Sequence, residues 1–175
     1  MKLLSDVRLL LLGLWLGAAV FMIAVAQSAF AVLPTREAAG ILVSRTLAIL
    51  NYSGLGIAIV LLLSSMIVAA GTRRVMVWAE RTLLILMAVA CAVAQFVFAW
   101  WMLLLRTQMG RPIDEVPADD PLRVQFNNLH QYSTWSLIIA MAAAVITFFI
   151  IANRRVTPVK KTGPADFDFG KQFKI

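Results

Sequence analysis

The chain has 175 residues, of which 61% are hydrophobic and 14% are charged; its mean hydropathy is +0.85 and its formal net charge is +7. A soluble domain of this length could not cover so much apolar side chain, so a water-soluble globular fold is excluded. The basic residues gather at the ends of apolar runs and in the C-terminal segment, a distribution that favours a membrane protein over a nucleic-acid binder. The single cysteine, Cys91, excludes an intrachain disulfide framework and a cysteine metal cage.

Four long apolar runs predict four membrane-spanning helices. These helices are expected at about residues 7–33, 40–71, 75–105 and 121–152. The first run is too long for a signal peptide and has no cleavage pattern, so we expect it to remain as an anchor. Residues 1–155 are therefore predicted to be one all-α, integral membrane four-helix bundle, followed by a basic and aromatic tail at residues 156–175.

The individual runs carry further signals. Pro34 ends the first run, and Asp120 followed by Pro121 has the composition of a helix start. The second run is over-long for a bilayer, and the two glycines of residues 51–56 favour a bend there. Glu80 and Arg81 suggest an ion pair at the membrane interface.

The distribution of Lys and Arg predicts the orientation in the membrane. With four spans, the head, the turn between the second and third spans, and the tail lie on one side, and together they hold 11 of the 16 basic residues. The other side holds 5. The positive-inside rule then places both termini in the cytoplasm, as in a multi-pass protein of the bacterial cytoplasmic (inner) membrane.

This topology is expected to gather polar side chains at the outer end of the bundle. Four residues of the last helix have spacings that put them on one helix face, and three more lie at the outer end of the second helix. If these two helices touch, Glu37 could pair with Arg123, and Arg45 could face Asn127 and His130. The predicted cluster comprises Arg36, Glu37, Arg45, Arg123, Asn127, His130 and Thr134.

Two roles remain open for this cluster. It could be a hydrogen-bonded cap that ties the outer loops to the bundle, or it could bind a ligand or relay protons. A metal, copper or haem site is the weaker option, because the chain has one histidine and no methionine at ligand spacing. No nucleophile–base pair or phosphate loop is seen, so we expect neither an enzyme nor a bound cofactor.

Two further sets of residues are expected to make contacts. Small residues allow helices to approach closely, and the candidates are Gly13, Gly17, Gly54 and Gly56. Basic and aromatic side chains alternate in the tail and suit docking on a partner protein or an anionic lipid surface. The candidate docking residues are Lys160, Lys161, Phe167, Phe169 and Phe173.

Three segments of the chain resemble a known family. They are residues 14–21, the Leu-Pro-x-Arg-Glu-x-x-Gly turn at residues 33–40, and the Phe-x-x-x-His-x-x-Ser segment at residues 126–133. Together they are similar to the transmembrane-protein-205-like family, whose bacterial members form a domain of unknown function, over about residues 8–150. The resemblance implies a four-helix membrane bundle. That family is distantly similar to copper-resistance-D-like membrane proteins, some of whose relatives handle haem or copper.

Two functional hypotheses follow. The first is a non-enzymatic accessory or scaffold subunit of a larger membrane assembly, which binds membrane-protein partners through its helix faces and tail. The second is a small carrier, or a ligand- or ion-binding membrane protein, with its pocket at Arg45, Asn127 and His130.

Overall fold

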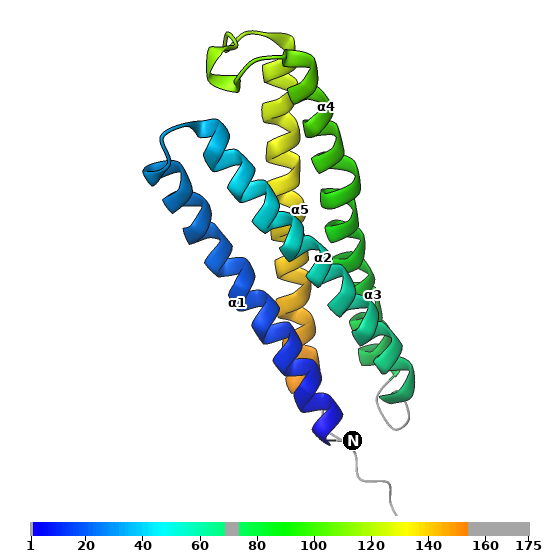
Figure 1. The fold of residues 1–175 in the computed structure, drawn as a ribbon. Helices are drawn as coiled ribbons and strands as arrows, with labels where there is room; N and C mark the ends of the chain where they lie inside the picture. Colours follow the sequence, from blue (N-terminus) through cyan, green and yellow to red (C-terminus); the bar gives the residue numbers. More distant parts are fainter. Residues whose placement is uncertain (1, 69–73, 154–175) are drawn as a thin grey trace, which may run out of the picture.

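The computed structural model describes residues 2–68 and 74–153, and all regular structure within them is helical (Figure 1). The elements are α1 (Lys2–Val32), α2 (Arg36–Val68), α3 (Arg74–Ala92), the π-helix η1 (Val93–Phe98), α4 (Ala99–Met109), the 3₁₀ helix η2 (Ile113–Glu115) and α5 (Pro121–Ala152). Four helical stretches are long and apolar enough to cross a membrane: Leu3–Val32, Arg36–Met66, Arg74–Met109 and Pro121–Ala152. The predicted all-α fold with four potential spans is confirmed.

The four long stretches pack as an up-and-down bundle in which each helix contacts its neighbours in sequence. α2 packs against α1 and α3, while α5 packs against α1, α3 and α4. α1 and α3 are therefore diagonal partners across the bundle, and so are α2 and α5. In Figure 1, α1 begins and α5 ends at the same end of the bundle, and the turn containing η2 lies at the opposite end.

The core lies between the helices and is filled by aliphatic, sulfur-containing and aromatic side chains. Its fully covered members include Leu12, Leu61, Leu84 and Met87. Large apolar side chains also point outward from every long helix, for example Phe21 and Leu63, which are 69% and 61% exposed. An outward apolar shell around an apolar core is what a lipid-embedded bundle requires, because lipid replaces water as the solvent.

The helices are regular except in the third span. α2 runs through residues 51–56 without a break, so the glycines expected to bend it do not interrupt the helix. Instead, six residues at Val93–Phe98 form a π-helix between α3 and α4. No sequence pattern indicates this π-helix, which contains Gln95.

The turn between α4 and α5 has clear start and stop signals. α4 ends at Gly110, whose φ of 61° lies in the left-handed region that glycine adopts without strain. α5 starts as the sequence predicts, because the Asp120 carboxylate accepts a hydrogen bond from the Leu122 backbone N–H at 2.8 Å. Pro121 occupies the first turn, where a missing N–H costs nothing.

Candidate functional site

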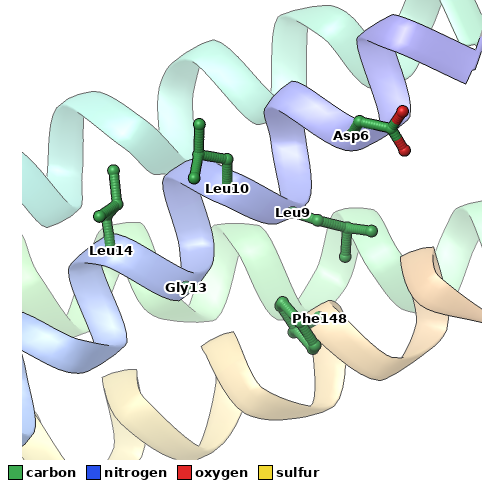
Figure 2. A pocket seen from close by; sticks show the side chains of 6 residues that line it. All are labelled: Asp6, Leu9, Leu10, Gly13, Leu14 and Phe148. Atoms are coloured by element: carbon green, nitrogen blue, oxygen red, sulfur yellow. The ribbon is translucent and has the colours of Figure 1, made fainter.

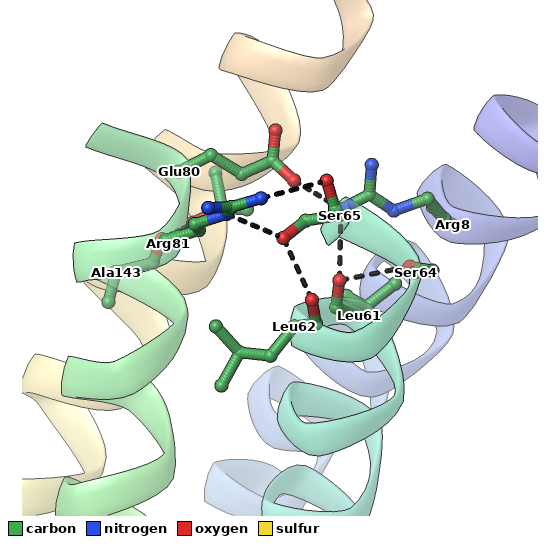
Figure 3. Close-up of polar contacts among 9 residues, drawn as sticks. Arg8, Leu61, Leu62, Ser64, Ser65, Glu80, Arg81 and Ala143 are labelled. Carbon is green, nitrogen blue, oxygen red and sulfur yellow. Dashed lines mark hydrogen bonds and ion pairs between the residues drawn. The ribbon is translucent and has the colours of Figure 1, made fainter. Parts of the chain in front are cut away.

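A group of buried and partly buried polar side chains joins three helices near the end of the bundle where α1 begins (Figure 3). We call Arg8 of α1, Ser65 of α2, and Glu80 and Arg81 of α3 the ion-pair cluster. Arg8 is 1% exposed and Glu80 is completely covered. Charged side chains are almost never buried to this extent unless they are paired, so the cluster is the most distinctive polar feature of the bundle.

The centre of the ion-pair cluster is a contact across the diagonal of the bundle. Nη2 of Arg8 donates to Oε1 of Glu80, and the same nitrogen lies 3.2 Å from the carbonyl oxygen of Leu61 in α2. Nε of Arg8 is buried and makes no hydrogen bond to the described residues. Arg8 thereby connects α1 to both α2 and α3 through one guanidinium group.

Arg81 turns away from this pair and bonds to α2. Its Nε donates to Oγ of Ser65 at 3.1 Å, and its Nη2 donates to the Ser65 carbonyl at 3.3 Å. Oγ of Ser65 donates in turn to the Leu62 carbonyl at 2.8 Å. The expected interfacial pair of Glu80 with Arg81 is therefore wrong in its geometry: Glu80 faces Arg8 in the core, because adjacent residues of a helix point about 100° apart.

The opposite end of the bundle holds the predicted cluster in a looser arrangement. Arg36 lies 3.9 Å from Asp114, and the two side chains are 70% and 46% exposed. Arg123 donates to the carbonyl of Val116 in the turn that precedes α5. Each contact ties the α4–α5 turn to a helix, whereas the suggested pairing of Glu37 with Arg123 is not among the ion pairs of the described residues.

The predicted face of α5 points out of the bundle. Asn127, His130 and Thr134 are exposed, whereas Phe126 and Leu129 beside them are buried. Arg45 is exposed on α2, which is diagonal to α5. The residues share a helix face as expected, but the structure does not bring Arg45 into one pocket with Asn127 and His130.

Sequence reasoning missed Arg106 at this end. Its guanidinium carbon lies 5.2 Å from the centre of the Phe126 ring, in a cation–π geometry. A Cβ atom at Gly40 would lie 3.0 Å from its Nη2. Arg106 therefore occupies the space where α2, α4 and α5 approach one another, and the bare backbone of Gly40 leaves room for it.

The four glycines proposed for helix packing differ in their surroundings. A Cβ at Gly54 would lie 2.7 Å from Nε1 of Trp15 and 2.9 Å from Sγ of Cys91, so this position admits only glycine without a shift. A Cβ at Gly13 would be in ordinary contact with Phe148 at 3.9 Å. Open space surrounds Gly17 and Gly56, which do not pack against another described helix.

Two shallow grooves lie on the outer surface of the bundle. One, of about 490 Å³, runs between α1 and α5, where Asp6 stands at one end of an apolar wall that includes Phe148 (Figure 2). The other, of about 250 Å³, lies beside η1 and is lined by Tyr52, Gln95 and Trp100 among others. Neither groove includes Arg45, Asn127 or His130.

Two further predictions concern the docking residues of the tail and a metal site. The tail residues proposed for docking lie outside the described residues: Lys160, Lys161, Phe167, Phe169 and Phe173. Within residues 2–68 and 74–153, no group of three or more His, Cys, Asp or Glu side chains could hold a metal ion. The ion-pair cluster joins three helices through hydrogen bonds and a charge pair.

Comparison with known proteins identifies a family. No curated protein matches the chain, and no solved structure matches it. Residues 10–111 match the family model described as Domain of unknown function (DUF4149), which covers α1 from residue 10 through α4. None of these comparisons supports the resemblance to transmembrane-protein-205-like or copper-resistance-D-like proteins. Since the match spans more than half of the 175 residues, the chain belongs to the DUF4149 family of domains of unknown function.

Proposed function

We propose that this protein is a non-enzymatic, multi-pass subunit of the bacterial inner membrane that acts through contacts with other membrane proteins. Both chain ends would lie in the cytoplasm, and the α4–α5 turn would lie outside. The role is that of an accessory or scaffold subunit. The observation that carries the proposal is the outward direction of the polar residues on the first turns of α5.

The spacing of polar and interfacial residues along α2 and the third span matches the thickness of a membrane. Ser65 follows Arg45 by twenty residues in α2, and Trp100 follows Glu80 by twenty in the third span. Twenty residues of helix rise about 30 Å, which is the thickness of a hydrocarbon core. On this scale the ion-pair cluster lies at one membrane boundary, and Arg45 and Trp100 lie at the other.

On the same scale, the exposed face of α5 would stand beyond the second boundary. Asn153 follows Thr134 by nineteen residues, so Asn127 and His130 stand in the headgroup region or above it. Neither side chain makes a hydrogen bond within the described residues. Tyr132 and Trp135 lie near them on the same helix and are 56% and 55% exposed. Aromatic side chains are enriched at protein interfaces, so this face suits a protein partner.

Site-specific photocrosslinking tests the proposal. A photoreactive amino acid replaces Asn127 in one version of the full chain and Ile138 in another, and crosslinks are formed in intact cells. Ile138 is the matched control, because it lies eleven residues further on the same helix face and is 46% exposed at hydrocarbon depth. We expect a discrete protein adduct from position 127 and lipid adducts alone from position 138. Lipid adducts alone from both positions would contradict a partner at this face.

The carrier hypothesis has weaker support. It requires Arg45, Asn127 and His130 to converge, yet Arg45 is on the helix diagonal to the other two, and all three are exposed. Its direct test is a thermal-shift screen with ions, haem and small anions on the purified protein and on His130→Ala. A ligand-dependent shift that His130→Ala abolishes would restore this hypothesis.

A further inference from the structure

A basic and aromatic face of α3 is not used by the ion pair in the core. Arg74, Trp78 and Arg81 are spaced by four and three residues, which places them on one side of the helix. Arg74 is exposed, Trp78 is 60% exposed and Arg81 is partly exposed. We call these three residues the α3 basic face.

Arg81 is held in place by the neighbouring helix. Two of its N–H groups donate to Ser65, one to the hydroxyl at 3.1 Å and one to the backbone carbonyl at 3.3 Å. A guanidinium has five N–H donors, so three remain for a ligand. Because its position is fixed before binding, Arg81 would lose less conformational entropy on meeting an anion than a free surface arginine.

The described acidic residues form no ion pair with Arg74 or Arg81. Glu80 is adjacent in sequence but is completely covered and paired with Arg8. Asp6 borders the groove between α1 and α5, whereas Arg81 bonds to α2 (Figures 2 and 3). The ion-pair cluster thus removes the Glu80 carboxylate from the surface, and within residues 2–68 and 74–153 no carboxylate forms an ion pair with Arg74 or Arg81.

The membrane level of the α3 basic face suits a lipid headgroup. Arg81 lies twenty residues before Trp101, so it stands about 30 Å along the helix from the adjacent Trp100 and Trp101 at the other boundary. Side chains of a helix tilt toward its N-terminus, and α3 begins at Arg74. Trp78 and Arg81 therefore lean toward the headgroup layer, where tryptophan is enriched and where a basic side chain meets phosphate.

We infer that the α3 basic face is a binding site for an anionic phospholipid, with Arg81 and Arg74 contacting the headgroup phosphate and Trp78 packing at the glycerol level. Arginine is suited to this task because its planar fork can bind two phosphate oxygens at once. Basic pockets between membrane helices are a known mode of headgroup recognition. Ser65 acts as the positioning residue, since it touches Arg81 and orients its guanidinium.

Native mass spectrometry of the purified full chain tests the inference. Delipidated protein in a neutral detergent is titrated with phosphatidylglycerol and, separately, with phosphatidylcholine. We expect phosphatidylglycerol to bind more tightly, and Arg74→Gln or Arg81→Gln to weaken it about fivefold each, as about 1 kcal/mol per arginine near a membrane surface implies. Arg36→Gln is the matched control, because it removes an exposed arginine at the far end of the bundle and should leave binding unchanged.

Further variants and a competition with inorganic phosphate separate a lipid site from a site for a soluble anion. Ser65→Ala should weaken phosphatidylglycerol binding less than Arg81→Gln does, because the Ser65 carbonyl still accepts from Arg81. Arg74→Gln keeps the test valid if Arg81→Gln does not fold, since Arg74 is the exposed first residue of α3. Equal binding of the two lipids, or an equal loss in Arg36→Gln, would overturn the inference. Displacement of the lipid by inorganic phosphate at the same concentration would overturn it as well, because the site would then serve a soluble anion.

Discussion

Arg8 and Glu80 pair across the diagonal of the bundle, from α1 to α3, with 1% and 0% of their surfaces exposed. The two helices share no other major packing surface, because α2 and α5 lie between them. Removing two charges from water is expensive, and only a well-placed partner offsets it. The pair therefore fixes how α1 is placed relative to α3, and it does so near the end of the bundle where the chain begins.

Breaking this pair on one side should be strongly destabilising. Glu80→Leu leaves the guanidinium of Arg8 buried without its carboxylate, which costs about 3–5 kcal/mol. The double variant Arg8→Met with Glu80→Leu removes both charges and should recover most of that loss. Unfolding in mixed detergent micelles measures the free energy for all three proteins. A double variant as unstable as the single one would show that the pair does more than neutralise charge.

An exposed ion pair provides the control for that experiment. Arg36 and Asp114 are 3.9 Å apart with side chains 70% and 46% exposed, so solvent screens their attraction. Asp114→Asn should change the free energy of unfolding by at most about 1 kcal/mol. A loss comparable to that of Glu80→Leu would mean that the assay does not distinguish buried from exposed charge.

Two glycines two residues apart should respond oppositely to the same substitution. Gly54→Ala places a methyl group 2.7 Å from Nε1 of Trp15, which donates a hydrogen bond to the Leu50 carbonyl at 3.0 Å. Overpacking of this kind costs about 1–3 kcal/mol. Gly56→Ala enters open space and should be neutral or stabilise α2 by up to about 1 kcal/mol, the helix-propensity difference.

The melting temperatures of the two alanine variants, measured in the same detergent, check this prediction. A second readout is the accessibility of Cys91 to a small thiol reagent, since its Sγ would lie 2.9 Å from a methyl group at position 54. We expect faster modification in Gly54→Ala than in Gly56→Ala. Equal melting temperatures and equal modification rates would contradict the close approach of α1, α2 and α3 at this point.

The start of α5 depends on one carboxylate. Asp120 accepts from the Leu122 N–H at 2.8 Å, and loss of such a cap costs about 0.5–2 kcal/mol. Asp120→Ala should lower stability by this amount, while Asp119→Ala, which removes an exposed neighbour of the same charge, should not. Thermal unfolding of the two variants measures the difference. If both variants lose the same stability, the effect belongs to the net charge of the turn.

The composition of the tail at residues 156–175 predicts partner-docking side chains, and truncation tests this prediction. Removal of residues 156–175 should release partners that co-purify with the full chain in mild detergent, because its basic and aromatic residues would be lost together. A second variant replaces only Phe167, Phe169 and Phe173 by serine and keeps all the lysines, so it separates the aromatic from the basic contribution. Partner recovery that is unchanged by truncation would remove the tail from the proposed interface.

Much of the fold could be predicted because hydropathy and helix signals are local. The four apolar runs, the end of α1 near Pro34, and the cap at Asp120 all depend on neighbouring residues. The partner of Glu80 could not be predicted in this way. Arg81 is beside it in sequence, but the residue that approaches it in space is Arg8, 72 positions away. Only the order in which the helices pack around the bundle determines that Arg8, and not Arg81, pairs with Glu80.

The sequence also could not predict whether the polar face of α5 points into the bundle or out of it. Asn127, His130 and Thr134 share a face by their spacing, but the apolar side chains of Phe126 and Leu129 also follow helical spacing, and it is these two that face the core. A helix that is apolar along most of its length gives a weak signal for its buried side, because lipid accepts the outward apolar residues. The π-helix at Gln95 has no local signal such as proline, so it too appears only in the structure.

Cysteine labelling tests the central claim, which is that the exposed face of α5 lies on the periplasmic side of the inner membrane and both chain ends lie in the cytoplasm. In a Cys91→Ser background, His130→Cys and Asn153→Cys each provide one exposed thiol at opposite ends of α5. A membrane-impermeant maleimide added to cells with a permeabilised outer membrane and an intact inner membrane should label position 130, and should label position 153 only after the inner membrane is opened. Labelling of position 153 with the inner membrane intact, with position 130 protected, would contradict the orientation and the function built on it.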